Sequence, residues 1–311
     1  MLNAPSARPL IAAAATGVLV GAAVVATRSV IDVAGPASLA FLRYASGAAV
    51  LVPVALLGRR PSIPGRDLLP IAVLGIGQFG ILVLLLNWSL ETITAGRAAL
   101  LFATMPLMTL VLAVTLRREP FAGTRLAGVM AAIGGVGLAL SEEILPAPGS
   151  GATDPSWAGH GAALGSALVG AVCSVAYRPY LERHPTLPVS AVAMVAAVAF
   201  LIIPAFGEAP AGRPPAMGMG EWATVAFIGL SSAIGYVCWL WALGHASATR
   251  VTVFLALSPV TAVLLETVIL GEPITTGVPA GAALVGFGLW LANRPVGVKH
   301  RCATDDASSQ R

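Results

Sequence analysis

Charged side chains are scarce in this sequence. Of its 311 residues, 18 are Lys or Arg and 14 are Asp or Glu, so charged residues make up 10% of the chain, whereas a soluble domain carries about 25%. So few charges cannot cover the surface of a soluble domain. The mean hydropathy of +0.86 also excludes a disordered chain, which needs low hydrophobicity and high net charge. The composition therefore predicts a polytopic helical membrane protein whose surface lies mostly against lipid.

The residues required for several kinds of chemistry are also missing. Three scattered cysteines without a CxxC pair do not form a disulfide framework. The sequence has no GxxxxGK[ST] phosphate loop, no HExxH and no GxSxG, and its four histidines are not clustered for a metal. We therefore expect no catalytic residue, no metal site and no cofactor, which disfavours an enzyme. The net charge of +4 is small and dispersed, so nucleic acid is not an expected partner.

Ten apolar runs are long enough to span a membrane, which takes roughly 20 residues in a helix. We place them at about 10–27, 37–57, 68–86, 98–116, 124–140, 158–177, 188–206, 222–241, 251–270 and 276–293. A poor cleavage site follows the first run, so we expect a retained span rather than a signal peptide. The predicted parts are a first five-helix repeat at 10–140, a polar linker at 141–157, a second five-helix repeat at 158–293 and a polar cytoplasmic tail at 294–311.

Basic residues predict the orientation of these spans. With the N-terminus in the cytoplasm, 14 of the 18 basic residues fall on the cytoplasmic side, Arg28, Arg97 and Arg213 fall on the other side, and Arg43 lies within a span. An excess of Lys and Arg marks the cytoplasmic side of membrane proteins. Because the number of spans is even, both termini are expected in the cytoplasm. We expect a multi-pass protein of the plasma or inner membrane.

The second half of the chain repeats the first at an offset of 153 residues, which places residues 87–140 over residues 240–293 without a gap. Chance explains matching Leu and Ala in apolar segments, but not matching Trp, Arg, Pro and Glu in one register. The identical pairs include Trp88/Trp241, Arg97/Arg250, Pro106/Pro259, Glu119/Glu272, Gly128/Gly281 and Gly135/Gly288. Because each repeat has an odd number of spans, the second enters the membrane from the opposite side. Inverted repeats of this kind are typical of secondary transporters that work by alternating access.

The repeated segments resemble the drug/metabolite transporter superfamily, in its ten-helix form with two EamA-type domains. In each repeat, a span with a central Pro is followed by a turn and by a Gly-rich span. The turn reads Leu270-Gly271-Glu272 in the second repeat, as in the family pattern, but only Glu119 is kept in the first. The segment GPASLAFLRYASG, which contains Arg43, also resembles the family's second helix. The resemblance implies a transporter, with export of a metabolite, amino acid or drug-like compound favoured, and is nearly silent on the substrate.

Two charged residues lie within apolar runs, where a charge is costly and usually faces a cavity. Glu266 is a candidate for proton coupling or for binding a substrate cation. The alternative is a carboxylate that reaches the membrane interface or pairs with a neighbour. Arg43 is a candidate for an anion contact or a gating ion pair. The alternative is a side chain that snorkels to the lipid headgroups or pairs at a helix end.

Pro106 and Pro259 lie at corresponding places inside the fourth and ninth runs, where each removes a backbone donor and predicts a kink or break. Paired interruptions point to a binding site between repeats, and a packing kink without a ligand is the alternative. Gln78 lies deep in the third run and needs a hydrogen-bond partner, which a substrate can provide. Tyr177 and Tyr236 are candidates for the lining of the same cavity.

Four charges mark the ends of the fourth and ninth runs. Arg97 and Arg250 open them, and Glu119 and Glu272 close them. These residues are either helix-end anchors that set the topology, or gate ion pairs that form and break as the halves move. A positive group at a helix N-terminus is unfavourable, which favours a specific partner for each Arg. Small residues in the fifth and tenth runs predict close helix packing, and the resemblance implies that these runs lie away from the pathway.

These features predict an all-α membrane protein of ten helices that transports small organic metabolites or drug-like solutes by alternating access. Coupling to protons rests on Glu266. The alternative is a non-transporting membrane subunit or a flippase partner. The expected partners are the lipid bilayer and a small-molecule substrate that the sequence does not identify. Whether the chain forms a homodimer is left open.

Overall fold

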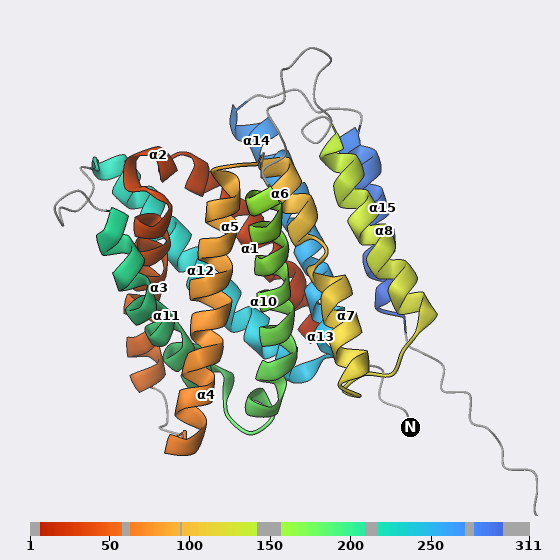
Figure 1. The fold of residues 1–311 in the computed structure, drawn as a ribbon, viewed down its shortest axis with the longest axis horizontal. Coiled ribbons are helices and arrows are strands. Elements are labelled where there is room, and N and C mark those ends of the chain that lie inside the picture. Colours follow the sequence, from red (N-terminus) through yellow and green to blue (C-terminus); the bar gives the residue numbers. More distant parts are fainter. Residues whose placement is uncertain are drawn as a thin grey trace, which may run out of the picture.

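The computed structural model describes residues 7–57, 63–93, 95–141, 157–208, 217–270 and 277–294. Every regular element in these ranges is a helix. In chain order they are α1 (Arg8–Arg28), α2 (Ile31–Ala34), α3 (Pro36–Leu57), α4 (Gly65–Gly75), η1 (Ile76–Ile81), α5 (Leu82–Leu90), α6 (Ala95–Phe102), α7 (Met105–Thr115), α8 (Gly123–Ala139), α10 (Trp157–Leu181), α11 (Thr186–Glu208), α12 (Met219–His245), α13 (Ala248–Thr252), η3 (Val253–Ala256), α14 (Leu257–Leu270) and α15 (Gly277–Ala292). Figure 1 shows the long helices side by side in one bundle, with α8 and α15 at one edge.

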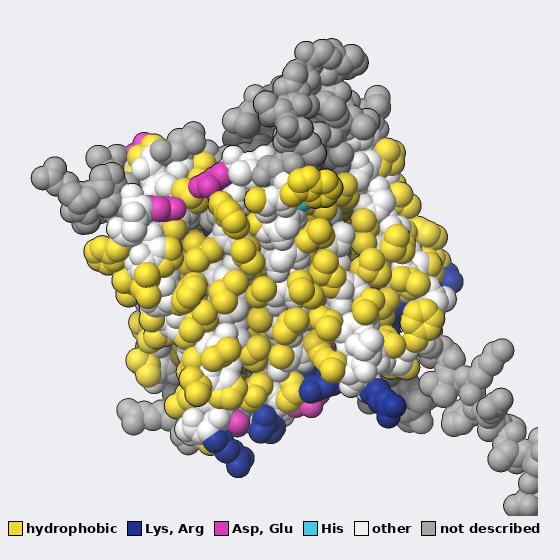
Figure 2. Space-filling model, in the orientation of Figure 1, with side chains coloured by type: hydrophobic (Ala, Val, Ile, Leu, Met, Phe, Trp, Pro, Cys, Tyr) yellow, Lys and Arg dark blue, Asp and Glu magenta, His cyan; other side chains and the backbone are white. Residues whose placement is uncertain are grey.

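Eight segments in the described part of the chain are long and apolar enough to cross a membrane. α8 and α15 are apolar as well, with 17 and 16 residues, or roughly 25 Å at 1.5 Å per residue. Each of the ten predicted runs therefore coincides with helix. Apolar side chains cover the flank of the bundle, and Lys and Arg side chains gather at its lower end (Figure 2). The chain is an all-helical, multi-pass membrane protein.

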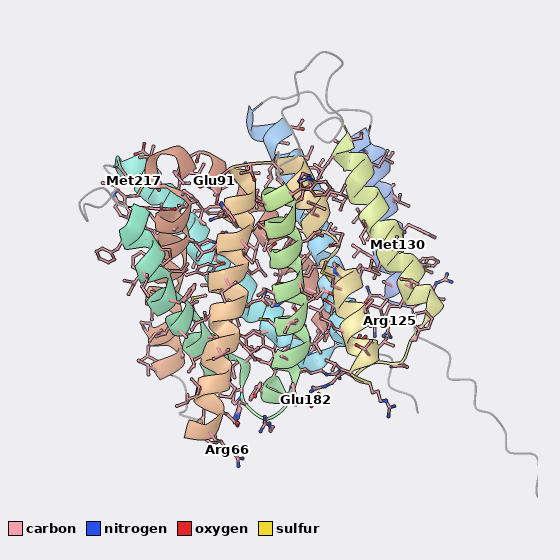
Figure 3. All side chains as sticks on the ribbon, in the orientation of Figure 1. Arg66, Glu91, Arg125, Met130, Glu182 and Met217 are labelled. Carbon is pink, nitrogen blue, oxygen red and sulfur yellow. The ribbon has the colours of Figure 1, made fainter. Side chains whose placement is uncertain are left out.

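The two ends of the bundle are named here after their short helices. The α2 face is the end where α2 lies, together with Glu91 and Met217, and the α13 face is the opposite end, with Arg66 and Glu182 (Figure 3). α12 runs from the α2 face to the α13 face, where α13 follows it.

The helices of the two repeats correspond at the offset found in the sequence. α6 begins at Ala95 and α13 begins at Ala248, which are 153 residues apart, since 248 minus 95 is 153. At the same offset α1 corresponds to α10, α3 to α11, the segment α4–η1–α5 to α12, α7 to α14 and α8 to α15. Two corresponding pairs, α3 with α11 and α8 with α15, pack directly against each other. The repeats are also joined by contacts between helices that do not correspond, such as α1 with α12 and α5 with α10.

Glycine makes the contact between α8 and α15 close. A Cβ on Gly128 would collide with the backbone of Ala292. A Cβ on Gly135 would collide with the backbone of Val285 in the same way. The close packing predicted for the fifth and tenth runs is therefore present. Gly286 differs, because nothing lies within 4 Å of a Cβ at that position.

Three of the membrane-crossing segments are interrupted. The fourth consists of α6 and α7, which are separated directly before Pro106 in the first turn of α7. The ninth contains the 3-10 turn η3 just before Pro259. The breaks predicted from the two prolines are thus present. The third contains η1, a π-helical turn with Gln78 in it, which the sequence did not predict; turns of this kind are frequent at functional sites.

Candidate functional site

A cavity of about 810 Å³ lies at the interface of the two repeats. Residues from corresponding helices line it together. The corresponding lining pairs are Gln78/Ser231, Phe79/Ser232, Leu82/Gly235, Val83/Tyr236, Leu86/Trp239, Phe102/Leu255, Ala103/Ala256 and Pro106/Pro259. The cavity therefore lies on the axis that relates the two repeats, which is where inverted-repeat transporters bind their substrates.

The cavity reaches the α2 face but not the α13 face. Its lining at one end includes Ile31 of α2 and the exposed Glu91. None of the residues of α13, all of which the structure describes, lines it. The other end is instead closed by a packed core that contains Tyr177, Leu243 and Val251, each fully buried. The cavity is thus accessible from one end of the bundle in this conformation.

A helix cap holds the rim of the cavity in place. The Glu208 carboxylate at the end of α11 accepts hydrogen bonds from the backbone amides of Ala37 and Ser38, at 2.8 and 2.9 Å, in the first turn of α3. A carboxylate at this place satisfies amides that have no partner within the helix. Gly35, which lines the cavity, precedes the cap with a φ of +77°, a conformation that glycine adopts without strain.

Arg43 carries the only positive charge among the described lining residues. Its Nε donates to the Ser232 hydroxyl at 2.6 Å, and that hydroxyl donates to the Ile228 carbonyl at 2.6 Å. The ion pairs of the described residues do not include Arg43. An arginine at the centre of a spanning helix costs about 2.5–3.5 kcal/mol on insertion scales. Because no carboxylate of the described residues pairs with Arg43, water or a ligand in the cavity would have to offset that cost.

Three further residues that line the cavity, Thr27, Gln78 and Trp239, each carry a buried polar atom without a partner in the described part of the chain. The Gln78 side chain is 8% exposed, and its Oε1 accepts no hydrogen bond. The Trp239 side chain is 4% exposed, and its Nε1 donates none. Buried polar atoms are nearly always hydrogen-bonded. An unpaired acceptor and an unpaired donor beside one cavity therefore indicate a place for a polar ligand.

Aromatic rings connect the helices around Arg43 and Gln78. The Tyr44 and Phe79 rings meet edge to face with their centroids 5.5 Å apart, and the Phe79 and Tyr236 centroids are 3.9 Å apart. Arg43 and Gln78, which precede Tyr44 and Phe79 in the sequence, line the same cavity as these rings. The Tyr236 hydroxyl lies 3.1 Å from that of Tyr177, which is fully buried behind the cavity wall.

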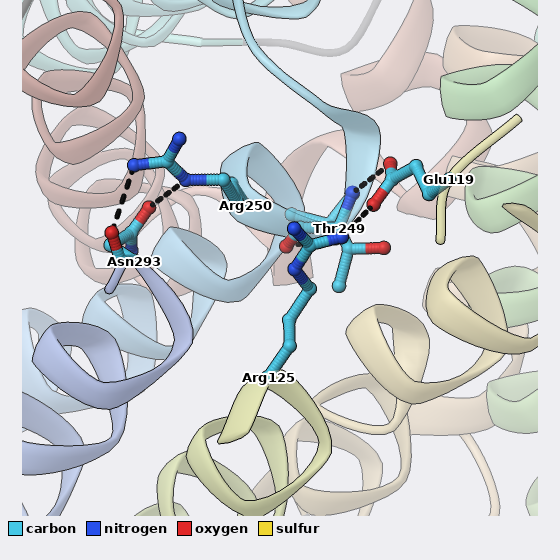
Figure 4. Close-up of polar contacts among 6 residues, drawn as sticks. Glu119, Arg125, Thr249, Arg250 and Asn293 are labelled. Carbon is cyan, nitrogen blue, oxygen red and sulfur yellow. Dashed lines mark hydrogen bonds and ion pairs between the residues drawn. The ribbon is translucent and has the colours of Figure 1, made fainter. Parts of the chain in front are cut away.

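A buried carboxylate closes the α13 face. Glu119 follows α7, and its Oε1 accepts from the backbone amide of Thr249 in the first turn of α13, at 3.1 Å (Figure 4). Its Oε2 accepts from Arg125 Nη1 of α8 at 2.7 Å. Glu119 and Arg125 are only 5% and 8% exposed. The carboxylate thereby joins α7, α8 and α13, and breaking such a buried pair costs about 3–5 kcal/mol.

Arg250 lies beside this cluster but binds a different partner. Its Nε donates to Asn293 Oδ1 at 3.0 Å, and its Nη2 donates to the Asn293 backbone carbonyl at 2.9 Å (Figure 4). A second buried carboxylate, that of Asp67 in α4, lies 2.7 Å from Nε2 of His184 in the turn after α10. All three polar contacts join elements at the α13 face.

The predicted site residues are placed as follows. Gln78, Tyr236, Pro106, Pro259 and Arg43 line the cavity, whereas Tyr177 lies behind Tyr236. Glu119 and Arg250 lie at the α13 face. Glu272 and the side chains of Glu266 and Arg97 lie outside the described part of the structure. The sequence did not single out Arg125, Asp67 or Trp239. Arg125 lies only a short turn after Glu119, in the first turn of α8.

A membrane bundle of two repeats around a shared cavity is the architecture of a membrane transporter. The model of the EamA-like transporter family matches this sequence twice, at residues 7–141 and 157–294. The chain belongs to the EamA-like transporter family.

Relatives with curated descriptions agree with this assignment. A protein of Streptantibioticus cattleyicolor described as a "Probable terminal-alkyne amino-acid exporter" is 34% identical over 82% of this chain and 80% of its own length. An "Uncharacterized transporter" of Archaeoglobus fulgidus is 27% identical over 83% of this chain and 89% of its own length. A solved crystal structure, at 22% sequence identity, superposes with a TM-score of 0.76 and covers 92% of this chain and 96% of the other. That likeness concerns the fold alone.

Proposed function

We propose that this transporter exports small organic solutes from the cytoplasm by alternating access, with the central cavity as the substrate site. The observation that carries the proposal is the position of the cavity between inverted repeats, open toward one face and sealed toward the other. The exporter relative supports the direction of transport and a substrate of amino-acid type. The positive-inside rule supports the α13 face as the cytoplasmic one, so that this conformation faces outward.

The proposed gate at the cytoplasmic side is the contact between α7 and α13, held by Glu119. α13 packs against α7, and Glu119 binds the first turn of α13. Opening this side requires the carboxylate to leave the Thr249 amide and α13 to move away from α7. Arg125 stabilises the carboxylate on the α7–α8 side, so α13 is the moving partner in this proposal.

Repeat symmetry predicts the gate at the opposite side. At the offset of 153 residues, Glu119 corresponds to Glu272, α13 to α6, and Thr249 to Gly96. In the inward-facing conformation, we expect Glu272 to accept from the backbone amide of Gly96 while α6 packs against α14. The two carboxylates then alternate, since each holds its gate closed only while the other gate is open.

Accessibility of single cysteines tests this mechanism. Ala262 lines the cavity on α14, and Ala248 is 3% exposed in α13. In a background in which the three native cysteines are replaced by Ala, we expect Ala262→Cys to react with a membrane-impermeant maleimide from outside the cell. We expect Ala248→Cys to be protected until a transported solute is added, and then to react from the cytoplasmic side. Reaction of both cysteines from the same side at all times contradicts alternating access.

Transport itself is measured in proteoliposomes with and without a pH gradient. The panel consists of labelled L-leucine, L-phenylalanine, an amino acid with a terminal alkyne, and a cationic dye. We expect at least one member to move faster than in empty liposomes. If no member moves and another membrane protein co-purifies in a fixed ratio, the chain is a subunit of a larger assembly instead.

A further inference from the structure

The cavity is lined by Arg43, whose guanidinium contacts the Ser232 hydroxyl and lies 5.5 Å from the centroid of the Tyr44 ring. Arg43 is the eighth residue of α3, so it lies about 10 Å along the helix from its start at 1.5 Å per residue. The ion pairs within the described ranges leave it without a carboxylate. Glu91, the acidic residue among the described lining, is exposed at the opening. A cation fixed inside a largely apolar cavity is a site for an anion.

The geometry of Arg43 leaves one edge of its guanidinium free. Nε is engaged by Ser232, whose own proton goes to Ile228. The described residues offer no hydrogen-bond partner to either Nη atom, so the edge formed by Nη1 and Nη2 is available to a ligand in the cavity. Two parallel N–H groups on this edge match the two oxygens of a carboxylate. Because Ser232 holds Nε, the guanidinium is oriented before the ligand arrives.

The remaining polar atoms of the cavity fit the rest of such a ligand. Gln78 Oε1 is a buried acceptor without a donor, and Trp239 Nε1 is a buried donor without an acceptor. Gln78 and Arg43 both line this cavity. An ammonium or amide group beside the carboxylate would supply the missing donor to Gln78. An additional oxygen would satisfy Trp239.

The other lining residues limit the ligand's size and charge. Most are apolar, among them Leu19, Val20, Leu82 and Phe102. A single arginine neutralises one negative charge, so a dianion such as a phosphate monoester would remain unbalanced there. A cavity of about 810 Å³ is within the usual range for small-molecule sites. The lining therefore favours a small monocarboxylate with an apolar body.

We propose that Arg43 binds the carboxylate of the transported solute, that Gln78 accepts a hydrogen bond from its amino group, and that the substrate class is apolar amino acids and related monocarboxylates. This inference rests on the proposed transport function but concerns binding. It is therefore tested on purified protein in detergent, where no gradient or gate movement is required.

The test compares ligands with and without the negative charge. L-leucine, L-phenylalanine and L-propargylglycine are each compared with the corresponding amide, which keeps the amino group and the side chain. Binding is measured by thermal stabilisation and by radioligand binding. For the wild type, we expect the carboxylates to bind roughly 10- to 100-fold more tightly than the amides, as the loss of charge-assisted hydrogen bonds predicts.

The variants are Arg43→Gln, Arg43→Lys and Gln78→Leu, with Arg66→Gln as the matched control. Arg66 is an exposed residue on the α13 face and does not line the cavity. We expect Arg43→Gln to lose the preference for carboxylates over amides, with amide affinity changed by no more than about twofold. Arg43→Lys should retain part of the preference, because an ammonium keeps the charge but not the two-pronged geometry. Gln78→Leu should weaken amino acids more than the matching carboxylic acids that lack the amino group.

The inference is overturned if wild-type carboxylates and amides bind equally, or if Arg43→Gln keeps the preference of the wild type. It is also overturned if no carboxylate of the panel binds the wild type at millimolar concentration. Monodispersity and helix content of each variant separate a local effect from misfolding. If dyes or amines are transported independently of Arg43, the transport proposal stands and this inference fails. If carboxylates bind through Arg43 but none is transported, this inference stands and the transport proposal fails.

Discussion

The two ends of the central cavity differ, although corresponding sequences build them. At the α13 face, α13 packs on α7 and Glu119 joins them. At the α2 face, the corresponding helices α6 and α14 make only marginal contact within the described residues, and both line the cavity. One repeat-related unit is thus seen in a closed and an open arrangement within the same molecule. The closed end therefore indicates which contacts the open end would make when the transporter changes to its other conformation.

Two helix pairs, in contrast, do not distinguish the open end from the closed end. The pairs α3–α11 and α8–α15 each join a helix to its own counterpart. When the open and closed ends are exchanged, each helix of such a pair takes the role of its counterpart, so the pair itself stays together. We therefore regard them as the scaffold, and the contacts of α6 and α13 as the moving parts. The predictions below separate the two sets.

The largest effect is expected in the scaffold. Gly135→Leu places a side chain where a Cβ already collides with the backbone of Val285. We expect a loss of about 3 kcal/mol or more of folded-state stability, measured as a fall in the apparent melting temperature and in the yield of monodisperse protein. Gly286→Leu is the control, because its position on α15 is exposed and open. Equal stability of the two variants would mean that α8 and α15 are not held in close contact.

The next effect concerns the closed gate. Glu119→Gln removes the charge that pairs with the buried Arg125 and weakens the acceptor of the Thr249 amide. We expect labelling of Ala248→Cys from the cytoplasmic side to rise by at least about tenfold, since 1.4 kcal/mol already corresponds to a factor of ten.

Glu182→Gln is the control for this gate variant. Glu182 lies on the same face and forms an exposed pair with Arg178 at 3.0 Å, and such pairs contribute little. We expect its labelling to remain within about twofold of the wild type. If Glu119→Gln behaves in the same way as this control, Glu119 does not hold the gate.

A smaller effect of opposite sign is expected from the corresponding residue. Glu272→Gln should destabilise the inward-facing conformation only, because the proposed contact of Glu272 with Gly96 forms there. Labelling of Ala262→Cys from outside should therefore increase, labelling of Ala248→Cys should decrease, and transport should slow. Combining Glu119→Gln with Glu272→Gln should bring both labelling rates back toward wild-type values. A double variant that labels like Glu119→Gln alone would disprove the symmetry of the two gates.

The smallest expected change is in the pH dependence of transport. Glu266 has Ala113 at the corresponding place in the first repeat, so it contributes to one half only. We expect Glu266→Gln to transport in the absence of a pH gradient but to lose the stimulation by a gradient. Transport by this variant across a pH series is the measurement. An unchanged pH dependence would remove Glu266 from the mechanism.

The fold was largely predictable from the sequence, for physical reasons. Three features of the sequence predicted the helices and their breaks: the apolar runs of spanning length, the repeat in one register, and the prolines at 106 and 259. Lipid requires such runs to be helical, so local pattern and structure agree. The small residues of α8 and α15 likewise predicted close helix packing, although they did not reveal that these two helices pack against each other.

The details of the site were less predictable. Gln78 and Arg43 were recognised as polar residues in apolar runs, but whether both line one cavity depends on how η1 and α3 are rotated about their axes. Glu119 was predicted to be either a helix-end anchor or part of a gate ion pair, and its partners are Arg125 and a backbone amide, which no charge pattern reveals. Tyr177 and Tyr236 are close in space, but packing places only Tyr236 in the cavity wall.

The bond between Glu119 and α13 has a consequence for natural variation. Its donor is a main-chain N–H, which every residue except proline provides at that position. The Thr249 side chain is fully buried, so a substitution that fits its packing leaves the contact intact, whereas substitution of Glu119 or Arg125 changes the charges that form it. A genetic screen for variants that bias the resting conformation should therefore recover Glu119 and Arg125 more often than size-conserving substitutions of Thr249.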